Sequence, residues 1–367
     1  MNQNKTTSRE PLFHVVKRPE RSGRQMLLFR LGAVALSILA GGLFILAIGY
    51  NPIEIYGTIL NGAFRSKIAV QSTIKITIPL CISALGATLA FKMKFWNIGG
   101  EGQIIMGGVF ATYFALFHAD WPHLPLMIVC FLAGLIGGGV WGLIPALFKV
   151  KWNTNETLLT LMLNYIALYI ISWLQNGPWR DPTANGFPKI AAFAKNAVLG
   201  NVLGVQAGWI VMLVFTVLVW VYLKFTKQGY EVAVVGESQD TARYAGIHVK
   251  KVILRTMFLS GAIGGVCGML QACGTDATLS TGIAGGVGFT AIIVAWLCQL
   301  NPGMILVVSF LFGVLEKGSG VVQSSYGLST DCAAVLQGII LFFILASEFF
   351  VRYAFAGRSS AKGGKKA

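Results

Sequence analysis

Charged residues are scarce in this sequence. Asp, Glu, Lys and Arg make up 12% of its 367 residues, whereas hydrophobic residues make up 55%. A soluble protein of this length carries about twice that charged fraction. The chain therefore has more apolar side chains than a water-facing fold can bury, which indicates a polytopic membrane protein. A net charge of +15 would suggest nucleic-acid binding in a soluble protein. In a membrane protein the location of the charges matters more, and we expect no nucleic-acid partner.

Catalytic and nucleotide-binding motifs are also missing. The sequence has no G-x-x-x-x-G-K-[ST] phosphate loop, since the stretch at 313–319 lacks that spacing. It contains neither H-E-x-x-H nor G-x-S-x-G, and its four histidines lie in terminal or loop positions. A channel or proton-coupled carrier usually shows a repeated selectivity-filter motif or a series of carboxylates buried in its spans. The predicted spans of this sequence contain few such carboxylates. We therefore expect no catalytic residue.

Paired cysteines and a cleavable signal peptide are absent as well. None of the six cysteines forms C-x-x-C, all lie in or at the ends of apolar segments, and no histidine cluster accompanies them. We expect them to be small buried residues, without a disulfide or a metal site. The first apolar segment, 27–48, is too long for the hydrophobic region of a signal peptide, and no A-x-A-like site follows it. It is predicted to remain as the first span.

Long apolar segments occupy most of the chain. A hydrocarbon core about 30 Å thick requires about 20 residues of helix per span. Segments of this length predict an all-α membrane protein with about ten transmembrane helices. Asn301-Pro302-Gly303 fits either a tight turn between the eighth and ninth spans or a break within a membrane-buried hairpin. The predicted spans are 27–49, 70–91, 98–117, 125–148, 156–175, 207–223, 252–271, 286–300, 303–317 and 333–351.

Lys and Arg residues are distributed unevenly among the predicted loops. If the N-terminus is inside, the cytoplasmic segments hold 22 of the 29, in groups of seven, two, two, six and five. Cytoplasmic loops of membrane proteins carry such an excess. We therefore expect both termini in the cytoplasm. The expected parts are a basic tail at 1–26, a membrane domain at 27–351 with a loop at 224–251, and a second basic tail at 352–367.

The segment at 224–255 contains a compact helix signal between two apolar spans. Ser238 is a good N-cap, and Asp240 suits the positive end of a helix dipole. Gly246 can adopt the left-handed backbone conformation that ends a helix. These signals predict a helix of about two turns with Ala242 and Ala245 on one side. The segment is either a solvated cytoplasmic loop or a docking site for a partner subunit. Length alone does not choose between the two.

Polar residues at the start of the third predicted span are candidates for the lining of a pathway. Asn97 can cap the helix, Glu101 lies near the positive end of its dipole, and Gln103 follows. Two glycines allow irregular backbone, which is tolerated at membrane depth only where it lines water or is covered by protein. The alternative is a helix cap in which Glu101 pairs with Lys92 or Lys94.

Further polar residues occur at two other places. Asn155 and Glu156 form a second capped, acidic helix start. Asn164 and Tyr165 lie two turns deeper, where an unpaired amide is costly, so we expect interhelical hydrogen bonds or pathway lining. The Gly/Thr-rich stretch 274–288 is too polar to span and predicts a broken or re-entrant segment near the outer side. The longest external segment, 176–206, can form a small cap over the outer mouth or a passive loop.

Several separated motifs resemble a family of bacterial permeases. They are FWNIGGEGQIIMGG at 95–108, NETLLTLMLNYIALYI at 155–170, GPWRDP at 177–182, GYEVAVVGESQDTARYAGIHV at 229–249, and GGVGFTAIIVAWL at 285–297 followed by NP. Together they look like a permease of ABC importers for ribose, branched-chain amino acids and nucleosides. The first two motifs are most similar to general nucleoside uptake permeases. Trp96 departs from the pattern, in which Phe more often directly precedes Asn.

The resemblance implies a type II-like importer permease in the bacterial plasma (inner) membrane. Its partners would be cytoplasmic ABC ATPase subunits, an extracellular solute-binding protein, a second permease subunit and the membrane lipid. ATP would bind to the ATPase, so no cofactor is expected on this chain. The segment at 229–247 matches the loop that couples the permease to the ATPase. Its matching positions are Gly229, Gly236, Glu237, Ala242, Arg243 and Gly246.

The nature of the substrate remains open at this point. Amides, hydroxyls and aromatic faces outnumber buried charges, which favours a neutral polar ligand such as a nucleoside. A simple sugar or a branched-chain amino acid is the alternative within the same family. An ion-coupled secondary transporter and a structural scaffold are alternatives from other classes.

Overall fold

The structure is a computed structural model, and it describes residues 13–17, 23–184, 186–329 and 331–357. The chain divides into two compact units, formed by 1–56 with 331–367 and by 57–330. Most of the two predicted basic tails, at 1–12, 18–22 and 358–367, lies outside the described residues. The rest of these tails includes β1 (Phe13–Lys17) and β4 (Tyr353–Gly357), which pair in antiparallel register.

The first unit is built on two long helices. α1 (Gly23–Ala47) packs along α13 (Asp331–Arg352). After α1 the chain turns by 112° into α2 (Pro52–Phe64), which the sequence did not predict as a helix. The Tyr56 hydroxyl at the start of α2 donates a hydrogen bond of 2.8 Å to the Ile38 carbonyl oxygen. This bond holds the bend, because it joins the two helices across the break.

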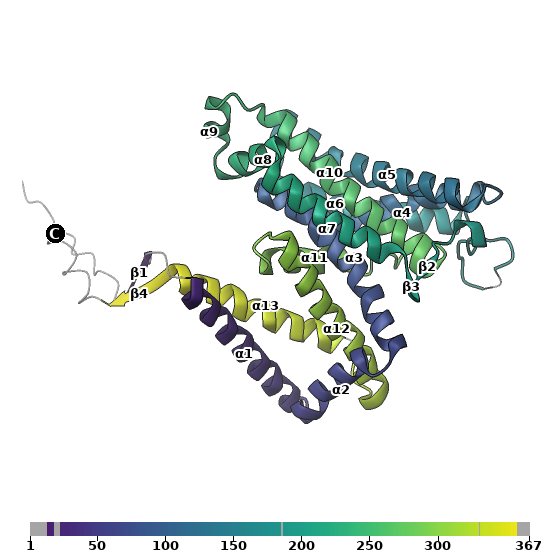
Figure 1. The fold of residues 1–367 in the computed structure, drawn as a ribbon. Helices are drawn as coiled ribbons and strands as arrows, with labels where there is room; N and C mark the ends of the chain where they lie inside the picture. The colour runs from purple at the N-terminus through teal and green to yellow at the C-terminus, as the bar shows by residue number, and fades with distance from the viewer. Residues whose placement is uncertain (1–12, 18–22, 185, 330, 358–367) are drawn as a thin grey trace, which may run out of the picture. The chain divides into compact units, whose positions relative to one another are not determined.

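The second unit is a helical bundle centred on α10 (Val249–Leu270). α10 packs against α3 (Lys67–Lys92), α4 (Gly100–Phe117) and α5 (His123–Trp152) (Figure 1). α6 (Glu156–Asn176), α7 (Gly208–Phe225) and α12 (Pro302–Tyr326) pack around these four helices. α10 and α3 are the most buried of the long apolar helices, at 72% and 78% of their most apolar stretch.

Glycines let the central helices approach each other closely. A Cβ on Gly265 of α10 would collide with the backbone of Gly134 and Gly138 on α5. A Cβ on Gly107 of α4 would collide with Gly265, and one on Gly268 would collide with Ile104. Helices in lipid associate through such small-residue contacts because no hydrophobic force drives them together. The close contacts of α4, α5 and α10 therefore depend on these glycines.

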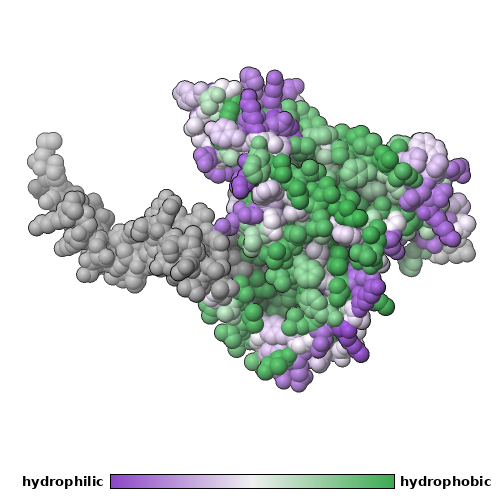
Figure 2. Space-filling view, in the orientation of Figure 1, coloured by the Kyte–Doolittle hydropathy of each residue, from purple (hydrophilic) through white to green (hydrophobic). Residues whose placement is uncertain are grey.

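Polar residues of the second unit gather at its two ends (Figure 2). One end carries α8 (Lys227–Glu237) and α9 (Gln239–Tyr244), which join α7 to α10. The opposite end carries η1 (Lys195–Ala197) and the short hairpin β2 (Asn201–Val202) and β3 (Val205–Gln206). Hydrophobic surface over α7 lies between them (Figure 2). This distribution is that of a bundle that crosses a membrane.

The structure confirms an all-α fold with several membrane-crossing helices, but not the predicted count of ten. Among the described residues, six helices are long and apolar enough to cross, or seven if the bent pair α1–α2 is one span. α11 (Val287–Leu297) has only 11 residues, too few for a span. α12 continues to Tyr326, beyond the predicted end at 317, because Glu316 and Lys317 do not interrupt the helix.

The Gly/Thr-rich stretch before α11 is irregular. α10 ends in one wide helical segment, η2 (Gln271–Asp276), and residues 277–286 are not helical. The side chains of Leu279 and Ile283 reach the middle of α4 at Gly108, and Gly288 lies against Gly100 at its start. The stretch begins at the predicted external segment, where the Phe193 N–H donates to the Ala277 carbonyl oxygen at 2.7 Å, and then runs along the first half of α4. Its start thus lies at the end of the bundle that carries the external segment, and the rest lies deeper.

We predict that Gly265→Ala destabilises the bundle, because its Cβ has no space between α10 and α5. Overpacking of this kind costs about 1–3 kcal/mol. The matched control is Gly320→Ala in α12, where an added Cβ meets nothing within 4 Å. Thermal unfolding in detergent should show a lower transition temperature for Gly265→Ala and an unchanged or higher one for Gly320→Ala. Equal transition temperatures would contradict the close packing of α10.

Candidate functional site

The segment between α7 and α10 contains two helices rather than the one predicted. α9 is the predicted short helix: the Ser238 hydroxyl accepts from the Thr241 N–H at 3.2 Å, and Gly246 beyond its end has a φ of +75°. The preceding helix, α8, begins where the Thr226 hydroxyl accepts from the Gly229 N–H at 3.0 Å. It has only 11 residues, too few to span a membrane, and it was not predicted from the sequence.

Three of the predicted coupling residues anchor α8 and α9 to the bundle. A Cβ on Gly229 would collide with the backbone of Tyr222 in α7, and one on Gly236 would collide with the Lys92 carbonyl oxygen of α3. Ala242 of α9 is fully buried in a cluster with Val249 and Val252 of α10. In addition, Arg255 of α10 forms an ion pair of 3.0 Å with Glu231 of α8. The segment is thus fixed to three helices.

The other three predicted coupling residues are exposed. Glu237, Arg243 and Gly246 all lie at the surface. Arg243 forms an ion pair of 2.9 Å with Asp240, and both side chains are solvent-accessible. Exposed pairs such as this contribute little to stability. Their charges therefore remain available to a partner that docks at α9.

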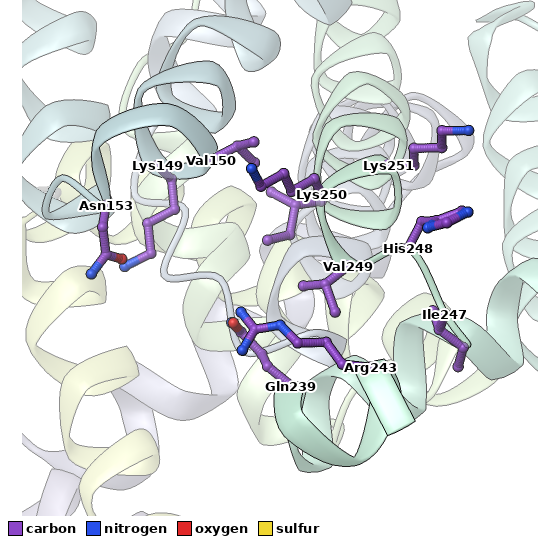
Figure 3. A pocket seen from close by; sticks show the side chains of 11 residues that line it. Lys149, Val150, Asn153, Gln239, Arg243, Ile247, His248, Val249, Lys250 and Lys251 are labelled. Atoms are coloured by element: carbon purple, nitrogen blue, oxygen red, sulfur yellow. The ribbon is translucent and has the colours of Figure 1, made fainter. Parts of the chain in front are cut away.

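A cavity of about 500 Å³ lies beside α9, between the end of α5 and the start of α10 (Figure 3). Arg243 and Gln239 line it from α9, while Lys149 and Asn153 line it from the end of α5 (Figure 3). Val150 and Lys250 also line it (Figure 3). Lys149 also forms an ion pair of 2.9 Å with Glu156. Four Lys and Arg side chains thus line the cavity, namely Lys149, Arg243, Lys250 and Lys251, which makes it basic.

Four of the candidate pathway residues are brought together at the start of α4. The side-chain amides of Asn97 and Gln103 pair with each other at 3.4 Å, and Asn97 donates to the Ser260 hydroxyl at 3.4 Å. Ser260 in turn donates to the Gly86 carbonyl oxygen at 2.8 Å. These buried side chains connect α3, α4 and α10 through hydrogen bonds. Each is at most 3% exposed, so none of the three side chains faces an open channel in this conformation.

Glu101 and Asn164 complete this group. The Glu101 carboxylate accepts from the Gly288 N–H at 2.9 Å, so it caps the start of α11 and pairs with neither Lys92 nor Lys94. Asn164 accepts from the Gly102 N–H at 2.8 Å and donates to the Ile98 carbonyl oxygen at 2.9 Å. The expected interhelical hydrogen bonding of Asn164 is therefore present. A buried amide with both groups paired fixes α6 to the start of α4.

Glu156 and Tyr165 lie apart from this group. Glu156 pairs with Lys149 at the end of α5, and Asn155 caps α6 by accepting from the Leu158 N–H at 3.1 Å. Tyr165 is 53% exposed, whereas its neighbour Asn164 is buried. Tyr165 therefore points away from the buried polar group.

An exposed face on and around α11 was not among the predicted site residues. Thr281, Gly285 and Gly286 of the irregular stretch are exposed, as are Phe289 and Trp296 of α11. The Trp96 ring stacks on Trp296, with ring centres 5.6 Å apart and planes 20° from parallel. The polar composition of 274–288 and the unusual Trp96 were the available signals. Their proximity depends on tertiary structure.

At the opposite end, the segment 177–207 covers the bundle. Its Phe193 and Leu199 N–H groups donate to the carbonyl oxygens of Ala277 and Cys273, both at 2.7 Å. The hydroxyl and the N–H of Thr183 both donate to Asp181, which lowers the pKa of that carboxyl. The predicted cap is thus an ordered layer that is bonded to the end of η2 and the irregular stretch.

The sequence matches the family of the permease component of branched-chain amino acid transport systems over residues 69–345. This range includes nearly all of α3, the elements from α4 to α12, and most of α13. The chain belongs to this permease family. It is therefore a transport component and a multi-pass membrane protein, as its motifs and apolar segments predicted.

Curated relatives of the family align with nearly the whole chain. The guanosine ABC transporter permease protein NupP of Bacillus subtilis is 30% identical and covers 92% of this chain and 97% of its own. The nucleoside ABC transporter permease protein NupB of Lactococcus lactis is 29% identical over 91% and 96%. The glucose ABC transporter permease protein TsgB13 of Haloferax volcanii is 30% identical over 88% and 89%. Guanosine and glucose permeases are thus equally similar to this permease.

We predict that Glu101→Leu lowers the stability of the permease, whereas Glu101→Gln does not. Leu leaves the Gly288 N–H without its acceptor at membrane depth, and an unsatisfied buried donor costs about 1–3 kcal/mol. Gln retains a carbonyl oxygen in that place. Intrinsic fluorescence during thermal unfolding in detergent measures the difference. If both variants unfold at the same temperature, Glu101 does not cap α11 in the folded permease.

Proposed function

We propose that this permease is the membrane subunit of an ABC importer and that the importer takes up a nucleoside. The observation that carries the proposal is the alignment of guanosine and nucleoside permeases with more than nine-tenths of the chain. A simple sugar is the second candidate, because a glucose permease is 30% identical as well.

In this proposal ATP is bound and hydrolysed by separate cytoplasmic ATPase subunits, and this chain binds no cofactor. An extracellular solute-binding protein delivers the ligand, and a second permease subunit, the same or similar, completes the pathway. Both termini then lie in the cytoplasm, and α8, α9 and the basic cavity face the ATPase. The covering segment 177–207 faces the solute-binding protein. The charge distribution supports this orientation, since cytoplasmic segments carry the excess of Lys and Arg.

The anchoring of α9 supports its role as the contact through which the ATPase moves the permease. Ala242 fixes α9 to α10, and Gly236 fixes α8 to the end of α3. A displacement of α9 is therefore passed to both helices. α10 carries Ser260, whose hydroxyl donates to the carbonyl oxygen of Gly86 in α3 and accepts from the amide of Asn97. The ATPase can switch the pathway between outward and inward access only if its contacts with α9 differ between these two states of the permease.

The buried candidates Asn97, Glu101, Gln103 and Asn164 act in this proposal by holding the helices that form the pathway wall. Their polar groups are already paired with each other or with backbone, so contact with the ligand would require those bonds to open. Tyr165 and Glu156 stay predictions as pathway residues.

The substrate is tested by competition. The full transporter is reconstituted in vesicles with its ATPase and binding protein, and uptake of labelled guanosine is measured with and without ATP. We expect ATP-dependent uptake that unlabelled nucleosides reduce and that glucose and leucine leave unchanged. Competition by glucose but not by nucleosides would favour the sugar alternative. Uptake by the isolated chain with only an ion gradient would contradict the importer and favour a secondary carrier.

We predict that Arg243→Glu and Glu237→Lys reduce ATP-driven uptake by more than about tenfold, because like charges facing each other at an interface cost several kcal/mol. The variants should still insert into the membrane at wild-type levels. The control is Lys67→Glu, an exposed charge at the start of α3 and outside the segment 177–207. The ATPase should still copurify with this control variant. Unchanged uptake in both α9 variants would contradict the role of α9.

A further inference from the structure

The irregular stretch 277–286 exposes backbone polar groups at the depth of the lipid tails, which cannot form hydrogen bonds with them. It runs along α4 between Gly108 and Gly100, and α4 has 18 residues, a length of about 27 Å. Gly285 and Gly286 are exposed, and within the described residues their N–H groups have no hydrogen-bond partner. Irregular backbone at membrane depth occurs only where it is covered by protein or lines a water-filled cavity. This stretch therefore faces water or protein rather than lipid.

α11 follows this stretch directly and carries exposed aromatic rings. Phe289 and Trp296 are seven residues apart, which places them two turns apart on one side of the helix. They are 43% and 37% exposed. Trp96 extends the surface by stacking on Trp296, and Phe91 supports both indoles from behind with ring centres at 5.9 and 5.5 Å. We call this surface the α11 face; it comprises Thr281, Gly285, Gly286, Phe289, Trp296 and Trp96.

A lipid-facing helix of the same bundle has a different surface. α7 exposes Val214, Val217 and Leu218 in its middle, each between 48% and 57%. Apolar side chains cover its backbone, whose polar groups are bonded within the helix. The α11 face instead combines free N–H donors and a hydroxyl with flat aromatic rings. Such a combination suits a ligand that has hydroxyl or carbonyl oxygens and a planar ring.

We propose that the α11 face is a wall of the translocation pathway and that it favours ligands with a flat heteroaromatic ring. The ring stacks on Phe289 and then on the Trp96–Trp296 pair, while the oxygens of the ligand accept from the Gly285 and Gly286 N–H groups. This inference rests on the proposed importer function and adds the residues and chemistry that select a nucleoside. A sugar without a planar ring gains the hydrogen bonds but not the stacking.

The first test measures whether the α11 face is accessible to water in the assembled transporter. Thr281→Cys and Phe289→Cys are treated with a charged, membrane-impermeant thiol reagent. Val217→Cys on α7 is the matched lipid-facing control. The native thiols form a small background, because five are buried and Cys332 is half-buried. We expect both α11-face variants to react, and guanosine to slow the reaction. We expect Val217→Cys to stay unmodified.

If neither α11-face variant reacts, the face is covered by the second permease or by lipid, and the proposal is overturned. Reaction that neither guanosine nor glucose slows also overturns it. If glucose slows the reaction and guanosine does not, the face lines the pathway but the preference for a ring is wrong.

The second test measures the stacking in uptake assays. Trp296→Leu should raise KM for guanosine by at least about fivefold, since stacking of a base on an aromatic ring is worth about 1–3 kcal/mol. Trp296→Phe retains a ring and should stay near the wild-type KM. Trp173→Leu is the control, because Trp173 is 66% exposed on α6 and outside the α11 face. A uniform loss in kcat for both Trp296 variants, with KM unchanged, would assign Trp296 a structural role.

The tests separate failure of this inference from failure of the proposed function. If guanosine uptake depends on ATP but is insensitive to Trp296→Leu, the importer function holds and the stacking is wrong. If no ATP-dependent uptake occurs, the proposed function is wrong, and the inference that rests on it is wrong as well.

Discussion

The backbone inside a membrane must satisfy its own polar groups, and this constraint explains the arrangement of the buried polar residues. At the start of α4, two glycines leave the chain irregular, and side chains from other helices supply the missing partners. Asn164 bonds to Gly102 and Ile98, and Glu101 bonds to the start of α11. Such bonds are costly to leave unmade in lipid. They therefore determine where α4, α6 and α11 meet.

The same group is connected through α10 to the end of the permease that carries α9. α10 contacts α9 through Ala242, packs closely on α4 and α5 through glycines, and carries Ser260 to the buried amide pair. Close backbone contacts leave little room for a helix to move independently of its neighbours. In the importer that we propose, movement at α9 would therefore be transmitted as a shift of several helices and would alter the α11 face as a whole.

Local features were predictable from the sequence. Ser238 and Asn155 cap helices because the capping interaction involves residues only three positions apart. The helices α3, α5, α6, α7 and α10 could be located by their long apolar composition alone. Helix α8 could not, because it is short and not strongly apolar. Helix α2 was not predicted either, although Gly49, with a φ of +89°, and Pro52 lie at the bend that precedes it.

Tertiary features were not predictable. Glu101 finds its partner 187 residues away, so the sequence suggested the nearby Lys92 and Lys94 instead. The stacking of Trp96 on Trp296 likewise joins distant segments. The polarity of 274–288 indicated a break, but its depth depends on the contacts of Leu279 and Ile283 with α4. Burial of Asn97 and Gln103 depends on the positions of α3 and α10, which no local pattern encodes.

The most direct measurement of the central claim is hydrogen exchange of the backbone at 281–289 in the complete transporter, held in lipid nanodiscs. If the irregular stretch faces water, peptides that contain Gly285 and Gly286 exchange rapidly, whereas peptides from the middle of α10 stay protected. Protection of 281–289 equal to that of α10 would mean that this backbone is covered, and it would contradict an aqueous pathway along α11.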